Sequence, residues 1–233
     1  MKFIDINNSI KAFLKKEVME LAAKEKIFFF AVIAVILFLL ILMHDSKIAL
    51  ISALCGISYT IFNGKGKIYC YFFGITGTLC YSYLAFKNGL WGNFFLNFLY
   101  YLPLEIIGLI NWKKHLINEF TVKKTKLNNK QRFFLIIISV AIASILVSIV
   151  YFYQFTILNF LDFLTLALSV MAMILAVKRC IEQWYLWSIV NFLSVILWIL
   201  AYINGSNCLA TIIMWGVYFV LGIYFLKEWK LQK

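Results

Sequence analysis

Eight apolar stretches, separated by loops that carry nearly all the charge, dominate this sequence. Each stretch has about 15 to 22 residues, near the roughly 20 that a helix needs to cross the hydrocarbon core of a bilayer. They cover residues 27–43, 48–62, 68–86, 91–112, 133–153, 157–177, 184–203 and 208–226. The stretch at 28–42 is continuously apolar, which excludes the alternating pattern of an outer-membrane barrel. We therefore expect an all-α integral membrane protein with eight transmembrane helices.

The basic residues lie almost entirely in alternate loops. Twenty of the 22 Lys and Arg residues fall before the first stretch, after the last one or in every second loop, whereas only Lys47 and Lys87 fall in the others. The positive-inside rule then predicts a multi-pass membrane protein with both termini in the cytoplasm. A net charge of +12 that follows loop order argues against nucleic acid as a partner.

Residues 1–26 place apolar side chains at helical spacing between lysines, which predicts a basic amphipathic leader on the cytoplasmic leaflet; a partly ordered tail is the alternative. The first predicted span, 27–43, has no cleavage site after it and is expected to stay in the mature protein. The five cysteines form no CxxC pair, so neither a disulfide framework nor a metal site is predicted.

The chain resembles itself when it is shifted by 116 residues, which aligns residues 83–89 with 199–205 as Leu-Ala-aromatic-x-Asn-Gly. We expect two parallel three-helix repeats, 48–112 and 157–227, joined by a basic cytoplasmic loop at 113–132 and a linker helix at 133–153. This is a 3+1+3 core with one extra helix before it. Transporters with such repeats bind substrate near mid-membrane between them and rock to give alternating access.

The fourth stretch contains a carboxylate where a bilayer makes charge costly. Asn97, Tyr101 and Glu105 recur at i, i+4 and i+8, so they form a polar stripe that faces protein or water rather than lipid. The only proline of the chain, Pro103, is expected to kink this helix just before Glu105.

The seventh stretch places two indoles and an amide at helical spacing. Trp184, Trp187 and Asn191 recur at i, i+3 and i+7, a combination suited to stacking on a flat heteroaromatic ligand and bonding its polar groups. An interfacial aromatic belt explains Trp184 equally well, but not the deeper two residues. The eighth stretch adds Trp215 and Tyr218 as candidate binding residues.

Residues 182–191, together with 100–112 in the fourth stretch, resemble the PnuC family of vitamin transporters, and the likeness covers about residues 48–230. The resemblance implies uptake of nicotinamide riboside by facilitated diffusion, trapping by cytoplasmic phosphorylation, a fold similar to full-length SWEET transporters and a homotrimer. The motif residues that it carries over are Trp184, Trp187, Asn191, Tyr100, Tyr101, Gly108 and Trp112.

One departure from the family pattern is Glu105, where an amide is expected. A carboxylate suits the pyridinium of nicotinamide riboside, but thiamine is also cationic, and riboflavin is a further vitamin substrate to consider. Whether Glu105 couples protons or only binds substrate stays open at this point.

The competing class is an integral membrane enzyme such as an acyl or isoprenyl transferase. The predicted spans contain no histidine, no paired aspartate-rich motif and no nucleotide-binding loop. We therefore predict a transporter, not an enzyme, with a small-molecule vitamin as substrate, the lipid bilayer as surroundings and no cofactor.

Overall fold

The computed structural model describes residues 47–231 apart from 88–93, 154–155 and 206–208, and six positions between 27 and 38. The predicted leader at 1–26 lies outside the described residues. The chain divides into two units, Met1–His44 and Asp45–Lys233, and the second contains all the helices with defined bounds.

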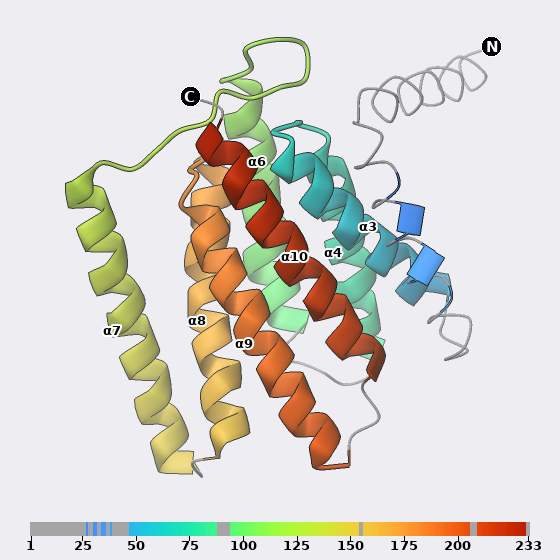
Figure 1. Ribbon diagram of the computed structural model, residues 1–233, viewed down its shortest axis with the longest axis vertical. Coiled ribbons are helices and arrows are strands. Elements are labelled where there is room, and N and C mark those ends of the chain that lie inside the picture. The colour runs from blue at the N-terminus through green and yellow to red at the C-terminus, as the bar shows by residue number, and fades with distance from the viewer. Residues whose placement is uncertain are drawn as a thin grey trace. The chain divides into compact units, whose positions relative to one another are not determined.

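The named elements of the second unit are all helices, and its described loops contain only isolated bridges, which confirms the all-α prediction (Figure 1). Its helices are α3 (Lys47–Gly64), α4 (Cys70–Lys87), η1 (Leu96–Tyr101), α6 (Leu102–Lys113), α7 (Asn129–Tyr153), α8 (Ile157–Val177), α9 (Gln183–Ile203) and α10 (Leu209–Leu231). Four of them are long and apolar enough to cross a membrane: α3, α8, α9 and the Thr211–Leu231 part of α10.

The helices form two groups that meet twice. In the first group α4 packs on α3 and α6, and in the second α9 packs on α8 and α10. The groups meet where α6 packs on α8 and where α10 packs on α3. α7 packs on α8 and otherwise presents apolar side chains outward, as a helix in lipid does.

Pro103 is preceded by a π-helical stretch. The N–H of Leu102 donates to the carbonyl of Asn97, five residues back, and η1 runs directly into α6. Pro103 has no N–H to donate within the helix, so the regular α-helical ladder is interrupted here. The predicted polar stripe does face protein: Glu105 is buried, whereas Ile106 and Ile107 on the opposite side are exposed.

Two turns at one end of the bundle repeat the same backbone pattern. In the first turn (65–69) the N–H of Lys67 donates to Phe62 at 2.8 Å, and in the second turn (178–182) the N–H of Cys180 donates to Leu175 at 2.9 Å. Each turn contains one residue with positive φ, Gly66 at 69° and Arg179 at 61°.

These equivalent positions are 113 residues apart, not the 116 found from the sequence. The difference arises because α9 has 21 residues, three more than the 18 of α4. A shift of 113 residues therefore aligns the beginnings of the two helices, and a shift of 116 aligns their carboxyl-terminal ends. The shift of 116 residues therefore does not hold at the beginnings of these two helices, where it is 113.

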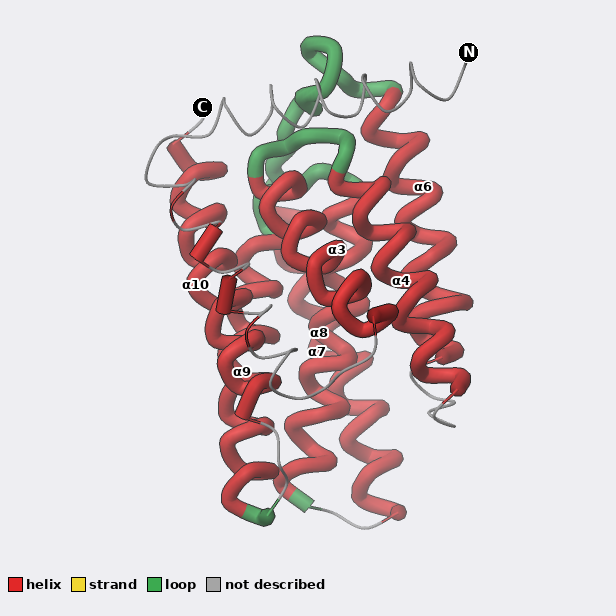
Figure 2. Tube along the Cα trace, turned by 90° about the vertical axis from the view of Figure 1, so that its right-hand side faces the viewer, coloured by secondary structure: helices red, strands yellow, loops and turns green. Residues whose placement is uncertain are grey.

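The loop at 114–128 joins both turns at what we call the basic end of the bundle (Figure 2). On the first turn, Ile68 donates to Phe120 and Val122 donates to Gly66, both at 2.9 Å. On the second turn, the backbone of Thr125 donates to Arg179 and accepts from Ile181, again at 2.9 Å. The loop thus connects the two groups of helices through main-chain hydrogen bonds.

Candidate substrate site

The centre of the candidate site is Glu105 on α6, whose side chain is only 5% exposed. The hydroxyl of Thr78 on α4 donates to Oε1 at 3.0 Å, and Oε2 is buried with no hydrogen-bond partner in the described part of the chain. Gly74 makes room for the carboxylate, since a Cβ there would lie 2.9 Å from Oε1. A buried carboxylate with one satisfied oxygen is able to accept a further donor or face a cation.

Tyr59 on α3 approaches the same place. A Cβ on Gly74 would lie 2.8 Å from its ring, so Tyr59 and Glu105 border the same glycine. Its hydroxyl lies 3.8 Å from the sulfur of Met173 on α8. The sequence prediction missed Tyr59 because a tyrosine near the end of a span reads as part of the interfacial belt.

An aromatic cluster continues from Met173. Tyr100, Tyr101 and Trp187 pack together against the buried residues Met173, Ala176 and Val177. The two tyrosines hold the π-helical stretch against α8: Tyr100 donates to the carbonyl of Val170 at 2.7 Å, and Tyr101 donates to the hydroxyl of Ser169 at 3.0 Å. Side chains from α3, η1, α8 and α9 therefore meet around Met173, and Tyr59 connects this cluster to Glu105.

Trp184 is not part of this cluster. Its ring is 2% exposed and lies 5.2 Å from Phe225 and 6.0 Å from Trp229, both on α10. Its three-residue distance from Trp187 turns the two indoles toward different neighbouring helices. The structure thus gives Trp184 a packing position at the basic end.

Asn191, Trp215 and Tyr218 form a second group between α9, α10 and α3. The amide of Asn191 donates to the carbonyl of Tyr218 at 2.9 Å, and the rings of Trp215 and Tyr218 meet edge to face at 5.9 Å. The Tyr218 hydroxyl reaches α3, where a Cβ on Gly56 would lie 2.8 Å from it. Asn97, the remaining candidate, is half-buried in η1.

Gly108 and Trp112, the other motif residues of the fourth span, pack around Tyr71. The ring of Tyr71 occupies the space where a Gly108 side chain would lie, and it meets Trp112 edge to face at 5.2 Å. The indole N–H of Trp112 donates to the carbonyl of Ala176 at 3.0 Å. These two residues hold α4, α6 and α8 together rather than contact Glu105.

Known proteins resemble this chain closely. Residues 46–231 match the family described as nicotinamide mononucleotide transporter. The nicotinamide riboside transporter PnuC of Neisseria mucosa is 32% identical over 195 residues, covering 81% of this chain and 74% of the relative. The protein of the same name from Haemophilus influenzae is 31% identical over 194 residues, covering 81% and 82%.

A solved structure also matches. The crystal structure of the vitamin B3 transporter PnuC superposes with a TM-score of 0.76 at 29% identity, covering 90% of this chain and 92% of that one. The family match covers most of the chain, and both curated relatives exceed 30% identity. The chain therefore belongs to the PnuC family of membrane transporters.

Proposed function

We propose that this protein carries nicotinamide riboside into the cell by facilitated diffusion, with phosphorylation in the cytoplasm trapping the product. The observation that carries the proposal is the buried Glu105 carboxylate, whose Oε2 has no hydrogen-bond partner among the described residues. Tyr59, which borders Gly74 together with Glu105, leads from it through Met173 to the aromatic cluster of Tyr100, Tyr101 and Trp187. The nicotinamide ring of this substrate is a flat cation. A carboxylate offsets its charge, while aromatic faces attract it by stacking and cation–π interaction.

Each candidate residue has a place in this proposal. Trp187, Tyr100 and Tyr101 stack on or border the ring, and Glu105 faces its charge. Asn97 and Asn191 are the amides for the carboxamide or ribose. Trp184, Trp215 and Tyr218 support the site from α9 and α10, since their described contacts lie with neighbouring helices.

We further propose that the core is a 3+1+3 arrangement of parallel repeats like that of SWEET transporters, preceded by one extra span to make eight. The shared hydrogen bonds of the two turns support it. A second pair of contacts does as well: Thr78 donates to Glu105 and Asn191 donates to Tyr218, each across 27 residues, between the second and third helices of each group. Rocking of one repeat against the other would then give alternating access.

The orientation and assembly are further parts of the proposal. The loop at 114–128 and the end of α10 carry many lysines, which supports cytoplasmic termini in the bacterial inner membrane under the positive-inside rule. The homotrimer rests on the family resemblance, and the outward apolar side chains of α7 and α6 leave surface for subunit contact.

Calorimetric titration of the purified protein with nicotinamide riboside, thiamine and riboflavin tests the substrate. We expect nicotinamide riboside to bind and Trp187→Ala to weaken binding about tenfold, or 1.4 kcal/mol. Ile189→Ala is the matched control on α9, because that side chain is 47% exposed on the outer face. Binding of thiamine alone would replace the substrate and keep the site; binding of none of the three would overturn the proposal.

The role of Glu105 has its own test. Glu105→Gln should weaken binding of cationic nicotinamide riboside more than binding of its uncharged dihydro form, since only the cation loses a charge partner. An equal loss for both ligands would mean that Glu105 does not recognise the charge of the ligand and has a structural role instead.

A further inference from the structure

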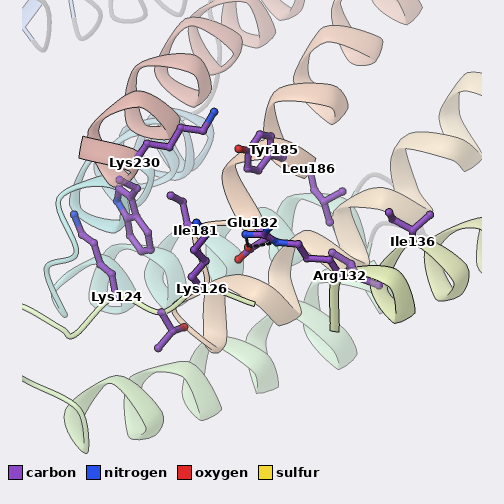
Figure 3. Close-up of a pocket in the computed structure, with 12 residues that line it drawn as sticks. Lys124, Lys126, Arg132, Ile136, Ile181, Glu182, Tyr185, Leu186 and Lys230 are labelled. Atoms are coloured by element: carbon purple, nitrogen blue, oxygen red, sulfur yellow. Dashed lines mark hydrogen bonds and ion pairs between the residues drawn. The ribbon is translucent and has the colours of Figure 1, made fainter. Parts of the chain in front are cut away.

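A cavity of about 680 Å³ lies at the basic end, away from Glu105, between the loop at 114–128 and the ends of α7, α9 and α10 (Figure 3). Its polar wall includes Lys124, Lys126 and Lys230. Its other wall consists of Leu135, Ile136 and Leu186, which lie on the two membrane helices α7 and α9. The cavity therefore combines positive charge with an apolar side at one level of the bundle.

The single carboxylate in the lining, Glu182, bonds Arg132 and Leu127. Glu182 accepts two hydrogen bonds from the guanidinium of Arg132, at 3.0 and 2.9 Å, and one from the backbone N–H of Leu127 at 3.1 Å. Glu228 lies outside the lining, where it pairs with Lys65 at 3.4 Å and also interacts electrostatically with Lys124. The Arg132–Glu182 pair thus links α7 to the start of α9, and the charges of Lys126 and Lys230 remain in the wall.

Aromatic rings position two of these lysines. The Lys124 ammonium lies 4.7 Å from the centre of the Trp229 ring, and the Lys230 ammonium lies 4.8 Å from that of Tyr185. Cation–π contacts of this kind hold an ammonium in place without neutralising its charge. In Figure 3, Lys124 and Lys230 lie on one side of Glu182, and Arg132 and Ile136 lie on the other.

We propose that this cavity binds the phosphate headgroup of an anionic phospholipid, with one acyl chain along α7 and α9. Lys126 and Lys230 supply charge for a phosphate diester, and Leu135, Ile136 and Leu186 supply the apolar surface for the chain. Basic pockets between membrane helices bind anionic headgroups in this way. A soluble phosphate would make no favourable contact with the apolar wall. Bound lipid joins α7 to α9, two helices that otherwise meet here through the Arg132–Glu182 pair.

Native mass spectrometry of the intact, detergent-purified protein tests this with three probes: phosphatidylglycerol, phosphatidylcholine with the same acyl chains, and inorganic phosphate. We expect phosphatidylglycerol to bind at least tenfold more tightly than phosphatidylcholine. The double variant K126A/K230A should weaken phosphatidylglycerol binding about tenfold or more, because each lysine near the headgroup contributes to its attraction. Both side chains are exposed, so the variant keeps the packing of the helix ends.

K113A/K114A is the matched control, since it removes two exposed lysines at the same end but outside the cavity. An equal loss in this control would mean that general basic charge, not the cavity, attracts the lipid, and would overturn the proposal. Equal binding of both lipids would overturn it as well. Displacement of phosphatidylglycerol by millimolar inorganic phosphate would identify a site for a free anion instead.

Discussion

The first turn (65–69) and the second turn (178–182) have the same backbone geometry but different residues at positive φ. The backbone hydrogen bonds that close them correspond, yet positive φ falls on Gly66 in the first and on Arg179 in the second. An arginine in this region carries a steric cost of roughly 1–2 kcal/mol that glycine does not. Its guanidinium offsets part of this cost by donating to the carbonyl of Lys123 at 3.1 Å.

The comparison shows that main-chain geometry is repeated where side chains are not. The glycine of the first turn needs no side-chain contact to adopt positive φ. The arginine of the second turn is held by the hydrogen bond from its guanidinium to the loop. The following predictions test that difference, beginning with the largest effect.

Replacing Thr125 by proline should lower the free energy of unfolding by about 2–4 kcal/mol. The change removes the N–H that donates to Arg179 and the hydroxyl that donates to the carbonyl of Lys178 at 2.8 Å. Thr125→Val removes only the hydroxyl bond and should cost about 1 kcal/mol. Chemical unfolding in detergent measures both, and equal losses for the two variants would show that the backbone bond contributes nothing.

Exchanging the residue types at positive φ should act in opposite ways. Gly66→Ala places a Cβ at φ 69° and should cost about 1–2 kcal/mol. Arg179→Gly relieves the strain but loses the bond to Lys123, so its net effect should stay within about 0.5 kcal/mol of zero. A loss above about 2 kcal/mol for Arg179→Gly would mean that the guanidinium, not the backbone, sets the second turn.

The two groups of helices also exchange indole hydrogen bonds. Trp112 at the end of α6 donates to the carbonyl of Ala176 on α8, and Trp229 near the end of α10 donates to that of Gly64 on α3. Trp112→Phe and Trp229→Phe should each cost about 1–2 kcal/mol, since each leaves a carbonyl without this buried donor and removes part of a ring. Thermal unfolding of the variants should give matched shifts; a shift for one variant alone would make the crossed contacts unequal.

Lys124 gives the smallest effect, which depends on pH. Burial lowers its pKa to about 8, nearby Glu228 raises it and nearby Lys65 lowers it. Because this pKa is lower than in the unfolded chain, the folded protein loses its proton first, and stability should rise as the pH increases from about 8 toward 10.5. Lys124→Met should remove this part of the rise; an unchanged pH profile in the variant would assign it to other groups.

The sequence was sufficient for the fold class and for the family. Hydropathy alone located α8, which covers the same residues as the apolar stretch at 157–177, and the aromatic motifs pointed to the PnuC family. Glu105 could be found because a carboxylate in an apolar span is conspicuous.

The arrangement of the site could not be predicted, because it depends on contacts between distant helices. Helical spacing put Trp184 and Trp187 on one face, but a three-residue step rotates one toward α10 and the other toward α8. The amide of Asn191 bonds a backbone carbonyl of α10, which no side-chain pattern reveals. The extra residue of the π-helical stretch likewise changes which side chains align, and it leaves no signature except the proline after it.

The loop at 114–128 is a mechanical connection that resists separation of the two turns. Its four main-chain hydrogen bonds, two to each turn, resist separation by roughly 2–6 kcal/mol in total. Since the bonds come from peptide groups, this connection tolerates almost any side chain, except at positions where proline would remove a donating N–H. If the two groups of helices tilt against each other, the pivot therefore lies near this end, and the displacement grows with distance from it. Over a 21-residue helix, about 30 Å long, a tilt of about 10° displaces the opposite end by about 5 Å.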